Sequence, residues 1–202
     1  MATKTTKKDS ILPPEFHGVA YIAGLRGVGK STLAAQADVP GNTAFLDFDD
    51  GKGRELDEQL HFGLYIDVMA EIAQQHGREW KPAQMHVMLD SLIDRIEPGR
   101  YTVCILDNID AIEVALAERV RRDPTAYGIE PDKARSGKFG GVWPAVNGLV
   151  SGLVSAIHAR GVMLVIAVAH TKAVWGAGGQ VPNKWRPRGV ERWQQMSILS
   201  LV

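Results

Sequence analysis

The sequence predicts an α/β fold, in which a mainly parallel β-sheet carries helices on both of its faces. Continuous apolar runs at residues 101–106 and 162–169 indicate strands that are buried on both sides, as the strands of parallel sheets are. Amphipathic segments separate these runs, and strands that alternate with helices favour parallel βαβ units. A glycine-rich loop at residues 24–32 joins an apolar run to a helical segment. Together these observations predict a three-layer sandwich.

The 202 residues suit one domain, which we expect to span residues 16–202 behind a flexible basic tail at residues 1–15. The formal net charge is zero, so no overall field attracts nucleic acid, and any such binding depends on local patches. A single cysteine, Cys104, excludes an intramolecular disulfide bond. We find neither a segment apolar enough to span a bilayer nor a signal peptide, and therefore expect a cytoplasmic protein.

The first elements lie around the glycine-rich loop. A short apolar strand at residues 18–23 precedes the loop, and a helix at residues 31–38 follows it. After a turn at Pro40-Gly41-Asn42, a second strand at residues 43–46 ends in an acidic run. In the segment from residue 52 to residue 79, the pattern indicates only one helix, within residues 67–76.

The remaining elements alternate in the same way. Residues 82–96 are predicted to be helical, because apolar side chains recur at helical spacing until Pro98-Gly99. Two segments rich in glycine, proline and charge, residues 123–141 and 173–189, are expected to be long loops, which in compact domains are usually functional. The other predicted elements are strands at 101–107, 162–169 and 197–202 and helices at 108–122 and 143–159.

The glycine-rich loop has the phosphate-binding pattern of two glycines four residues apart, followed by lysine and a hydroxyl residue. Gly27 and Gly29 allow positive φ angles that turn backbone N–H groups toward phosphate oxygens, and the helix N-terminus adds its dipole. Lys30 supplies an ammonium group for the β- and γ-phosphates, and the Ser31 hydroxyl is a ligand for Mg²⁺. We expect nucleotide contacts from Gly24, Leu25, Arg26, Gly27, Val28, Gly29, Lys30, Ser31 and Thr32.

Acidic residues follow two of the predicted strands. Asp107 ends the strand at 101–107, where it would hold Mg²⁺ through water; the alternative is an N-cap for the next helix. Asp49 and Asp50 are candidates for the general base that activates water, with Asp49 preferred, although Asp-Asp-Gly is also a common turn sequence. Asp47 is expected to orient its neighbours. Lys30 and Asp49 are therefore candidate catalytic residues.

His170 is the third candidate catalytic residue. It closes the apolar strand at 162–169, beside the expected γ-phosphate, and could sense that phosphate and pass its state to the following loop. The alternative is a structural histidine.

A segment near the C-terminus interleaves cations with aromatic residues. Cations suit phosphates and aromatic faces suit bases, so the segment favours single-stranded nucleic acid, although a solvated surface loop would have a similar composition. The candidate residues are Lys184, Trp185, Arg186 and Arg188, followed by Arg192 and Trp193.

Taken together, the motifs resemble the RecA-like P-loop ATPases, particularly compact versions that phages encode beside recombination genes. The resemblance covers residues 16–202 by the order of motifs and implies a RecA-like core that binds ATP and Mg²⁺. The family has a glutamate where this chain has Asp49, and its second signature strand matches residues 103–107. Its phosphate sensor, often glutamine or histidine, matches His170.

The resemblance also implies partners. In the family, two loops flanking the sensor strand bind DNA, which assigns that role to residues 123–143 and 173–189. Family members form rings or filaments with ATP between subunits, so the resemblance implies a homo-oligomer.

Three functions follow from these observations. The first is an ATPase stimulated by single-stranded DNA in recombination or annealing. The second is a small-molecule or nucleotide kinase, for which Arg119, Arg121 and Arg122 would have to form the lid. The third is a nucleotide-dependent scaffold that does not hydrolyse ATP. A GTPase is disfavoured, because no Asn-Lys-x-Asp element follows any predicted strand.

Overall fold

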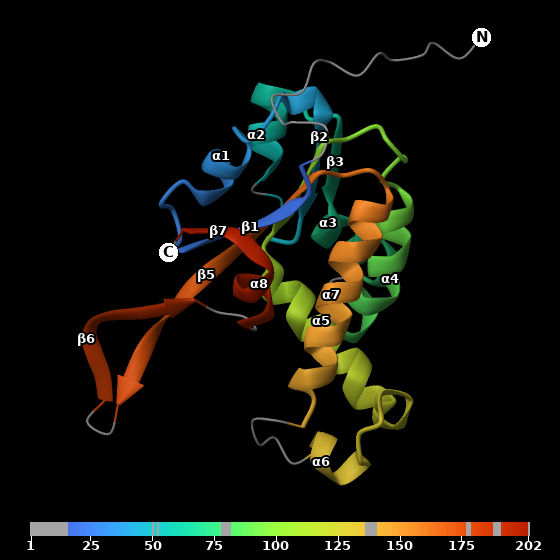
Figure 1. Cartoon of the computed structure of the whole chain (residues 1–202), viewed down its shortest axis with the longest axis vertical. Coiled ribbons are helices and arrows are strands. Elements are labelled where there is room, and N and C mark those ends of the chain that lie inside the picture. The colour runs from blue at the N-terminus through green and yellow to red at the C-terminus, as the bar shows by residue number, and fades with distance from the viewer. Residues whose placement is uncertain are drawn as a thin grey trace.

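A computed structural model of the chain describes residues 16–49, 51, 53–77, 82–135, 141–176, 179–187 and 191–201 (Figure 1). The predicted basic tail at residues 1–15 lies outside this part. No helix within the described ranges is long and apolar enough to cross a membrane.

The described strands form one sheet with the order β3-β2-β4-β5-β1-β7, and every neighbouring pair along this path is parallel. A further strand, β6, pairs only with the outer part of β5 and runs antiparallel to it. The predicted α/β fold with a mainly parallel sheet is thus confirmed. The strands are β1 (Gly18–Gly24), β2 (Thr43–Asp47), β3 (Leu64–Asp67), β4 (Val103–Asp107), β5 (Leu164–Gly176), β6 (Gly179–Pro187) and β7 (Ser197–Leu201).

Helices cover both faces of the sheet. Successive residues of a strand point to opposite faces, and accordingly Tyr21 belongs to the larger apolar core whereas Ile22 belongs to the smaller one. Buried residues of α3, α4, α5 and α7 complete the larger core, and α1 and α2 cover the smaller one. The helices are α1 (Lys30–Ala34), α2 (Gly53–Leu60), α3 (Val68–His76), α4 (Pro82–Asp94), α5 (Ile109–Arg122), α6 (Pro131–Arg135), α7 (Trp143–Ala159) and α8 (Glu191–Met196), with short 3₁₀ turns η1 (Pro40–Asn42) and η2 (Pro124–Tyr127).

Several predicted helices agree closely with the structure. The helix predicted at 143–159 is α7, and those predicted at 82–96 and 108–122 are α4 and α5. Asn108 caps α5, because its side-chain oxygen accepts a hydrogen bond from the backbone N–H of Ala111 at 3.3 Å. The helix expected at 31–38 is shorter, since α1 ends at Ala34.

The segment between residues 52 and 79 contains more structure than the sequence indicated. Besides α3, it forms α2 and the edge strand β3. Helix α2 is mostly polar, and only Leu56 and Leu60 pack against the smaller core, so its apolar periodicity is weak. Strand β3 has four residues, too few to show an alternating pattern.

The two predicted loops were also wrong in part. Residues 123–141 include η2 and α6. Residues 173–189 include the end of β5 and all of β6, which form a hairpin that extends away from the sheet (Figure 1). Helix α8, which the sequence analysis did not predict, leads to β7, and β7 pairs with β1 in the region where a final strand was expected.

Candidate functional site

The glycine-rich loop connects β1 to α1 at the carboxyl edge of the sheet. Gly27 and Gly29 have φ angles of 77° and 84°, in the left-handed region that only glycine adopts without strain. A Cβ atom at either position would meet no atom within 4 Å, so the backbone angle and not crowding requires glycine. The side chains of Leu25 and Val28 are exposed, so at these positions it is the backbone that forms the loop.

Lys30 is the first residue of α1. Its Nζ donates a hydrogen bond to the backbone oxygen of Leu25 at 2.8 Å, which folds the ammonium group back across the loop. Burial lowers the pKa of Lys30, although the carboxylates of Asp107 and Asp49 oppose this effect. The ammonium group thus lies among acidic side chains at the mouth of the loop.

Strand register brings Asp107 next to this loop. Asp107 ends β4 between Asp47 of β2 and Val168 of β5, and its Oδ2 accepts a hydrogen bond from the Ser31 hydroxyl. Asp107 is only 7% exposed, and burial raises the pKa of its carboxyl group.

The hydroxyl and carboxylate oxygens of Ser31 and Asp107 are the donors that Mg²⁺ prefers. No group of three or more histidine, cysteine, aspartate or glutamate residues in the described ranges is placed to hold a metal ion. Mg²⁺ is usually bound by one or two protein groups, with phosphates and waters completing its shell. The residue types of this pair therefore fit a nucleotide-bound Mg²⁺.

Asp49 lies on the segment that follows β2, and it connects two other segments of the site. Its Oδ1 is 3.2 Å from Nη2 of Arg26 on the glycine-rich loop, and its Oδ2 is 3.9 Å from Nε2 of His170. Asp50, the alternative candidate, lies outside the described residues.

Asp47 lies where it can orient neighbouring residues, as the sequence suggested. It is buried, and it accepts hydrogen bonds from the backbone N–H groups of Asp49 at 2.8 Å and Gly53 at 2.6 Å and from the Tyr65 hydroxyl at 3.0 Å. Burial raises the pKa of this carboxyl group. Asp47 therefore holds the segment that carries Asp49 against the sheet.

His170 lies on β5 directly opposite Gly24 of β1. Its Nδ1 is 3.2 Å from Oδ2 of Asp110, which stands in the first turn of α5. Sequence reasoning did not select Asp110. The spacing from Asp107 could have indicated Asp110, because a residue three positions after the strand end falls in the first turn of the next helix.

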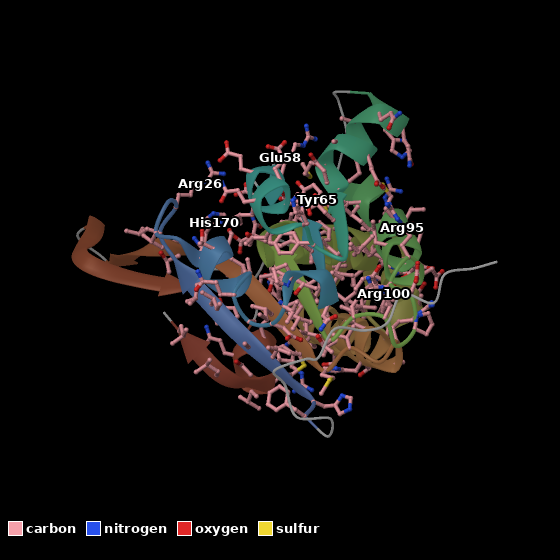
Figure 2. All side chains as sticks on the ribbon, turned by 90° about the horizontal axis from the view of Figure 1, so that it is seen from above. Arg26, Glu58, Tyr65, Arg95, Arg100 and His170 are labelled. Carbon is pink, nitrogen blue, oxygen red and sulfur yellow. The ribbon has the colours of Figure 1, made fainter. Side chains whose placement is uncertain are left out.

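These segments line a cavity of about 530 Å³ that is open to solvent. Figure 2 shows Arg26 and His170 close together on one side of the molecule, with Arg95 on the other. The sequence did not reveal that α2 forms one wall of the cavity, because α2 itself was not predicted. The lining residues comprise Arg26, Gly27, Gly29, Lys30, Ser31, Thr32, Asp49, Asp107 and His170, together with Glu55, Leu56 and Gln59 of α2.

The candidate nucleic-acid residues fall into two groups. Lys184, Trp185 and Arg186 lie on β6, and Arg188 lies outside the described residues. Trp193 is fully buried in the larger core, which contradicts its inclusion among residues that could stack on bases. Arg192 donates a hydrogen bond from Nε to the Ser151 hydroxyl at 2.8 Å, so it attaches α8 to α7.

Comparison with known proteins identifies the family. A search of curated proteins gives no match. A family model described as an AAA domain matches residues 19–192, which include the glycine-rich loop, both acidic strand ends and His170. The chain therefore belongs to this AAA-domain family and is a nucleotide-binding P-loop NTPase.

Proposed function

We propose that the protein is a Mg²⁺-dependent, RecA-like ATPase that couples ATP hydrolysis to the binding of single-stranded DNA in recombination or annealing. The observation that carries this proposal is the course of β5. The strand leaves the core at Ala169, contributes His170 to the cavity, and continues directly into the hairpin with β6. The basic and aromatic residues of β6 are thus joined to the nucleotide cavity by one continuous strand.

The register of the hairpin supports an anionic partner. Lys172 of β5 and Arg186 of β6 occupy opposite register positions in the hairpin, and both residue types carry a positive charge. A phosphate backbone is the kind of partner that such cationic residues bind. We assign DNA binding to Lys184, Trp185, Arg186 and Arg188, a combination of cations with an aromatic residue that suits single strands.

The glycine-rich loop binds the phosphates in this proposal. Its backbone N–H groups and the N-terminus of α1 surround the phosphate oxygens, and the Lys30 ammonium exchanges the Leu25 carbonyl for the β- and γ-phosphates. The hydrogen bond from Lys30 to the Leu25 carbonyl occupies the ammonium group before phosphate binds. Breaking this hydrogen bond therefore offsets part of the free energy gained from the new contact with phosphate.

Ser31 and Asp107 would hold Mg²⁺, which supplies positive charge against the phosphate oxygens as negative charge develops on them. The Ser31 hydroxyl donates a hydrogen bond to Asp107, which keeps both oxygens at the cavity. Burial of Asp107 strengthens its interaction with a cation, since the surrounding dielectric is low.

The γ-phosphate end of the cavity holds Lys30, Asp49 and His170, the three candidate catalytic residues of the sequence analysis. Asp49 is the carboxylate expected from the sequence to act on water. His170 contacts the γ-phosphate through Nε2 while its Nδ1 lies 3.2 Å from Oδ2 of Asp110, so that loss of the phosphate releases the start of the hairpin. The family resemblance adds assembly as a homo-oligomeric ring or filament.

The test is phosphate release from Mg-ATP with and without single-stranded DNA, with Lys30→Ala as the blank. The proposal expects stimulation by DNA that disappears when Lys184, Trp185 and Arg186 are changed to alanine. Arg95→Ala is a matched control, because Arg95 is an exposed arginine paired with Glu71 on the far side of the molecule (Figure 2). A hydrolysis rate that is indifferent to DNA would refute the coupling.

Two alternatives make different predictions. A kinase would need an arginine-bearing lid, but Arg119 and Arg121 pair with Asp90 and Glu118, and neither lines the described cavity. A non-hydrolysing scaffold would bind ATP tightly and release no phosphate under any condition.

A further inference from the structure

Helix α2 is attached firmly to the carboxyl edge of the sheet. A Cβ atom on Gly53, its first residue, would lie 2.8 Å from a ring carbon of Phe45, 2.9 Å from Oδ2 of Asp47 and 3.0 Å from a ring carbon of Tyr65. Only glycine permits this approach. The N–H of Gly53 then donates to the same Asp47 oxygen at 2.6 Å. The close packing and this hydrogen bond therefore fix the position of the first turn of α2 relative to β2.

Two turns of α2 face the nucleotide cavity. Glu55, Leu56 and Gln59 line it, which is the spacing expected of one side of a helix. Leu56 packs partly against the smaller core, so the helix cannot rotate Glu55 away without exposing an apolar side chain. The Glu55 carboxylate makes no hydrogen bond or ion pair with any other residue that the structure describes.

The other acidic candidate is engaged differently. One oxygen of Asp49 faces the Arg26 guanidinium at 3.2 Å, and the other faces His170 Nε2 at 3.9 Å. The ion pair with Arg26 takes only part of the accepting capacity of the carboxylate, but it fixes the direction of Asp49 toward the glycine-rich loop. Asp49 bridges the glycine-rich loop and β5, which is the arrangement of a residue that positions others.

We propose that Glu55 is the general base of the reaction and that Asp49 is a positioning residue, an inference that rests on the ATPase activity proposed above. The Glu55 carboxylate accepts a proton from a cavity water as the water oxygen forms its bond to the γ-phosphorus. The bond between the γ-phosphorus and the β,γ-bridging oxygen breaks, its electron pair leaves with ADP, and Glu55 returns the proton to solvent. Water and ATP thus yield ADP, phosphate and one proton.

The test compares Glu55→Gln, Asp49→Asn and Glu58→Gln in the full chain. Glutamine keeps the size of Glu55 but cannot take the proton. Glu58 is the matched control, since it lies one turn further along α2, is exposed and does not line the cavity (Figure 2). The readouts are phosphate release with DNA, the Kd of a fluorescent ATP analogue, and the Kd of ADP with aluminium fluoride, which imitates the transferred phosphoryl group.

Loss of a general base lowers turnover by about 100- to 10,000-fold, and this is the decrease expected for Glu55→Gln. Its Kd for the ATP analogue should stay within about twofold of the unchanged protein, whereas binding of ADP with aluminium fluoride should weaken by about tenfold or more, because that complex holds the attacking water. Asp49→Asn should weaken binding of the ATP analogue, and Glu58→Gln should behave as the unchanged protein.

Three results would overturn the inference. Full turnover in Glu55→Gln, with turnover lost in Asp49→Asn, would make Asp49 the base and leave the proposed ATPase intact. A weakened Kd for the ATP analogue in Glu55→Gln, in proportion to its loss of turnover, would make Glu55 a binding residue. Absence of hydrolysis by the unchanged protein, with and without DNA, would refute the ATPase and this inference together.

Discussion

The indole of Trp193 should contribute to stability and not to DNA binding. The side chain is completely buried in the larger core, and a buried tryptophan removes about 150–250 Å² from water. At about 25 cal/mol per Å², this burial corresponds to about 4–6 kcal/mol, close to the range of roughly 3–5 kcal/mol for aromatic-to-alanine changes in cores. We therefore expect Trp193→Ala to lower the free energy of unfolding by about 4 kcal/mol.

For a chain of this length, each kcal/mol shifts Tm by about 2–4 °C, so Trp193→Ala should lower Tm by about 8–16 °C. Trp193→Phe is the matched control. The indole N–H has no hydrogen-bond partner among the described residues, so phenylalanine removes an unsatisfied donor while keeping most of the apolar area, and a change below about 1.5 kcal/mol is expected. Thermal unfolding followed by circular dichroism measures both. An unchanged Tm together with reduced affinity for single-stranded DNA would refute the reasoning.

Three further predictions concern titratable groups. Because burial raises the pKa of Asp107, ionisation of this carboxyl group destabilises the folded state as pH rises above the unfolded value of about 3.9. Asp107→Asn should therefore have a Tm at pH 8 equal to or above that of the unchanged protein, but Mg-ATP should no longer raise the Tm of the variant. A lower Tm of the variant without ligand would contradict this prediction. Lys30→Ala should leave Tm within a few degrees and weaken ATP binding by about 10- to 100-fold, measured by titration of a fluorescent analogue; unchanged affinity would exclude the assigned contact. Cys104 is fully buried with its pKa raised to about 12, so a thiol reagent at pH 8 should react only after denaturant is added, and rapid reaction of the native protein would be inconsistent with the fold.

The parts of the fold that the sequence predicted well are those with strong local patterns. Strand β4 and the start of β5 are continuous apolar runs, and α7 has an apolar stripe along most of its length. The burial of these elements can be predicted from the local sequence, because a strand between two helical layers requires apolar side chains on both faces.

Elements that depend on distant partners were missed. Strand β5 continues beyond Ala169 because β6 pairs with it, and that pairing joins residues that no local window compares. Helix α2 depends on Gly53 fitting against Phe45 and Tyr65, a contact made by three strand and helix segments. Glu55 could therefore not be predicted as a site residue from the sequence, because α2, the helix that carries it, was not predicted.

Within the candidate site, residues fixed by backbone geometry were easier to anticipate than those fixed by packing. The glycine-rich loop and Asp107 are marked by spacing and by a strand end. Trp193 was misread because composition alone does not tell whether an aromatic residue next to arginines is buried.

The length of β5 has a mechanical consequence. The strand pairs with β4 up to Val168 and with β1 up to His170, and within the described residues its part from Thr171 to Gly176 pairs with β6 alone. With a rise of about 3.3 Å per residue, this outer part of β5 is about 20 Å long. A tilt of about 10° at His170 would therefore move its far end by about 3–4 Å. A small change of backbone direction at the cavity would therefore produce a larger displacement at the far end of the hairpin. A disulfide bond across the hairpin would stiffen this outer part, and comparing the oxidised and reduced forms would test whether its movement is coupled to events in the cavity.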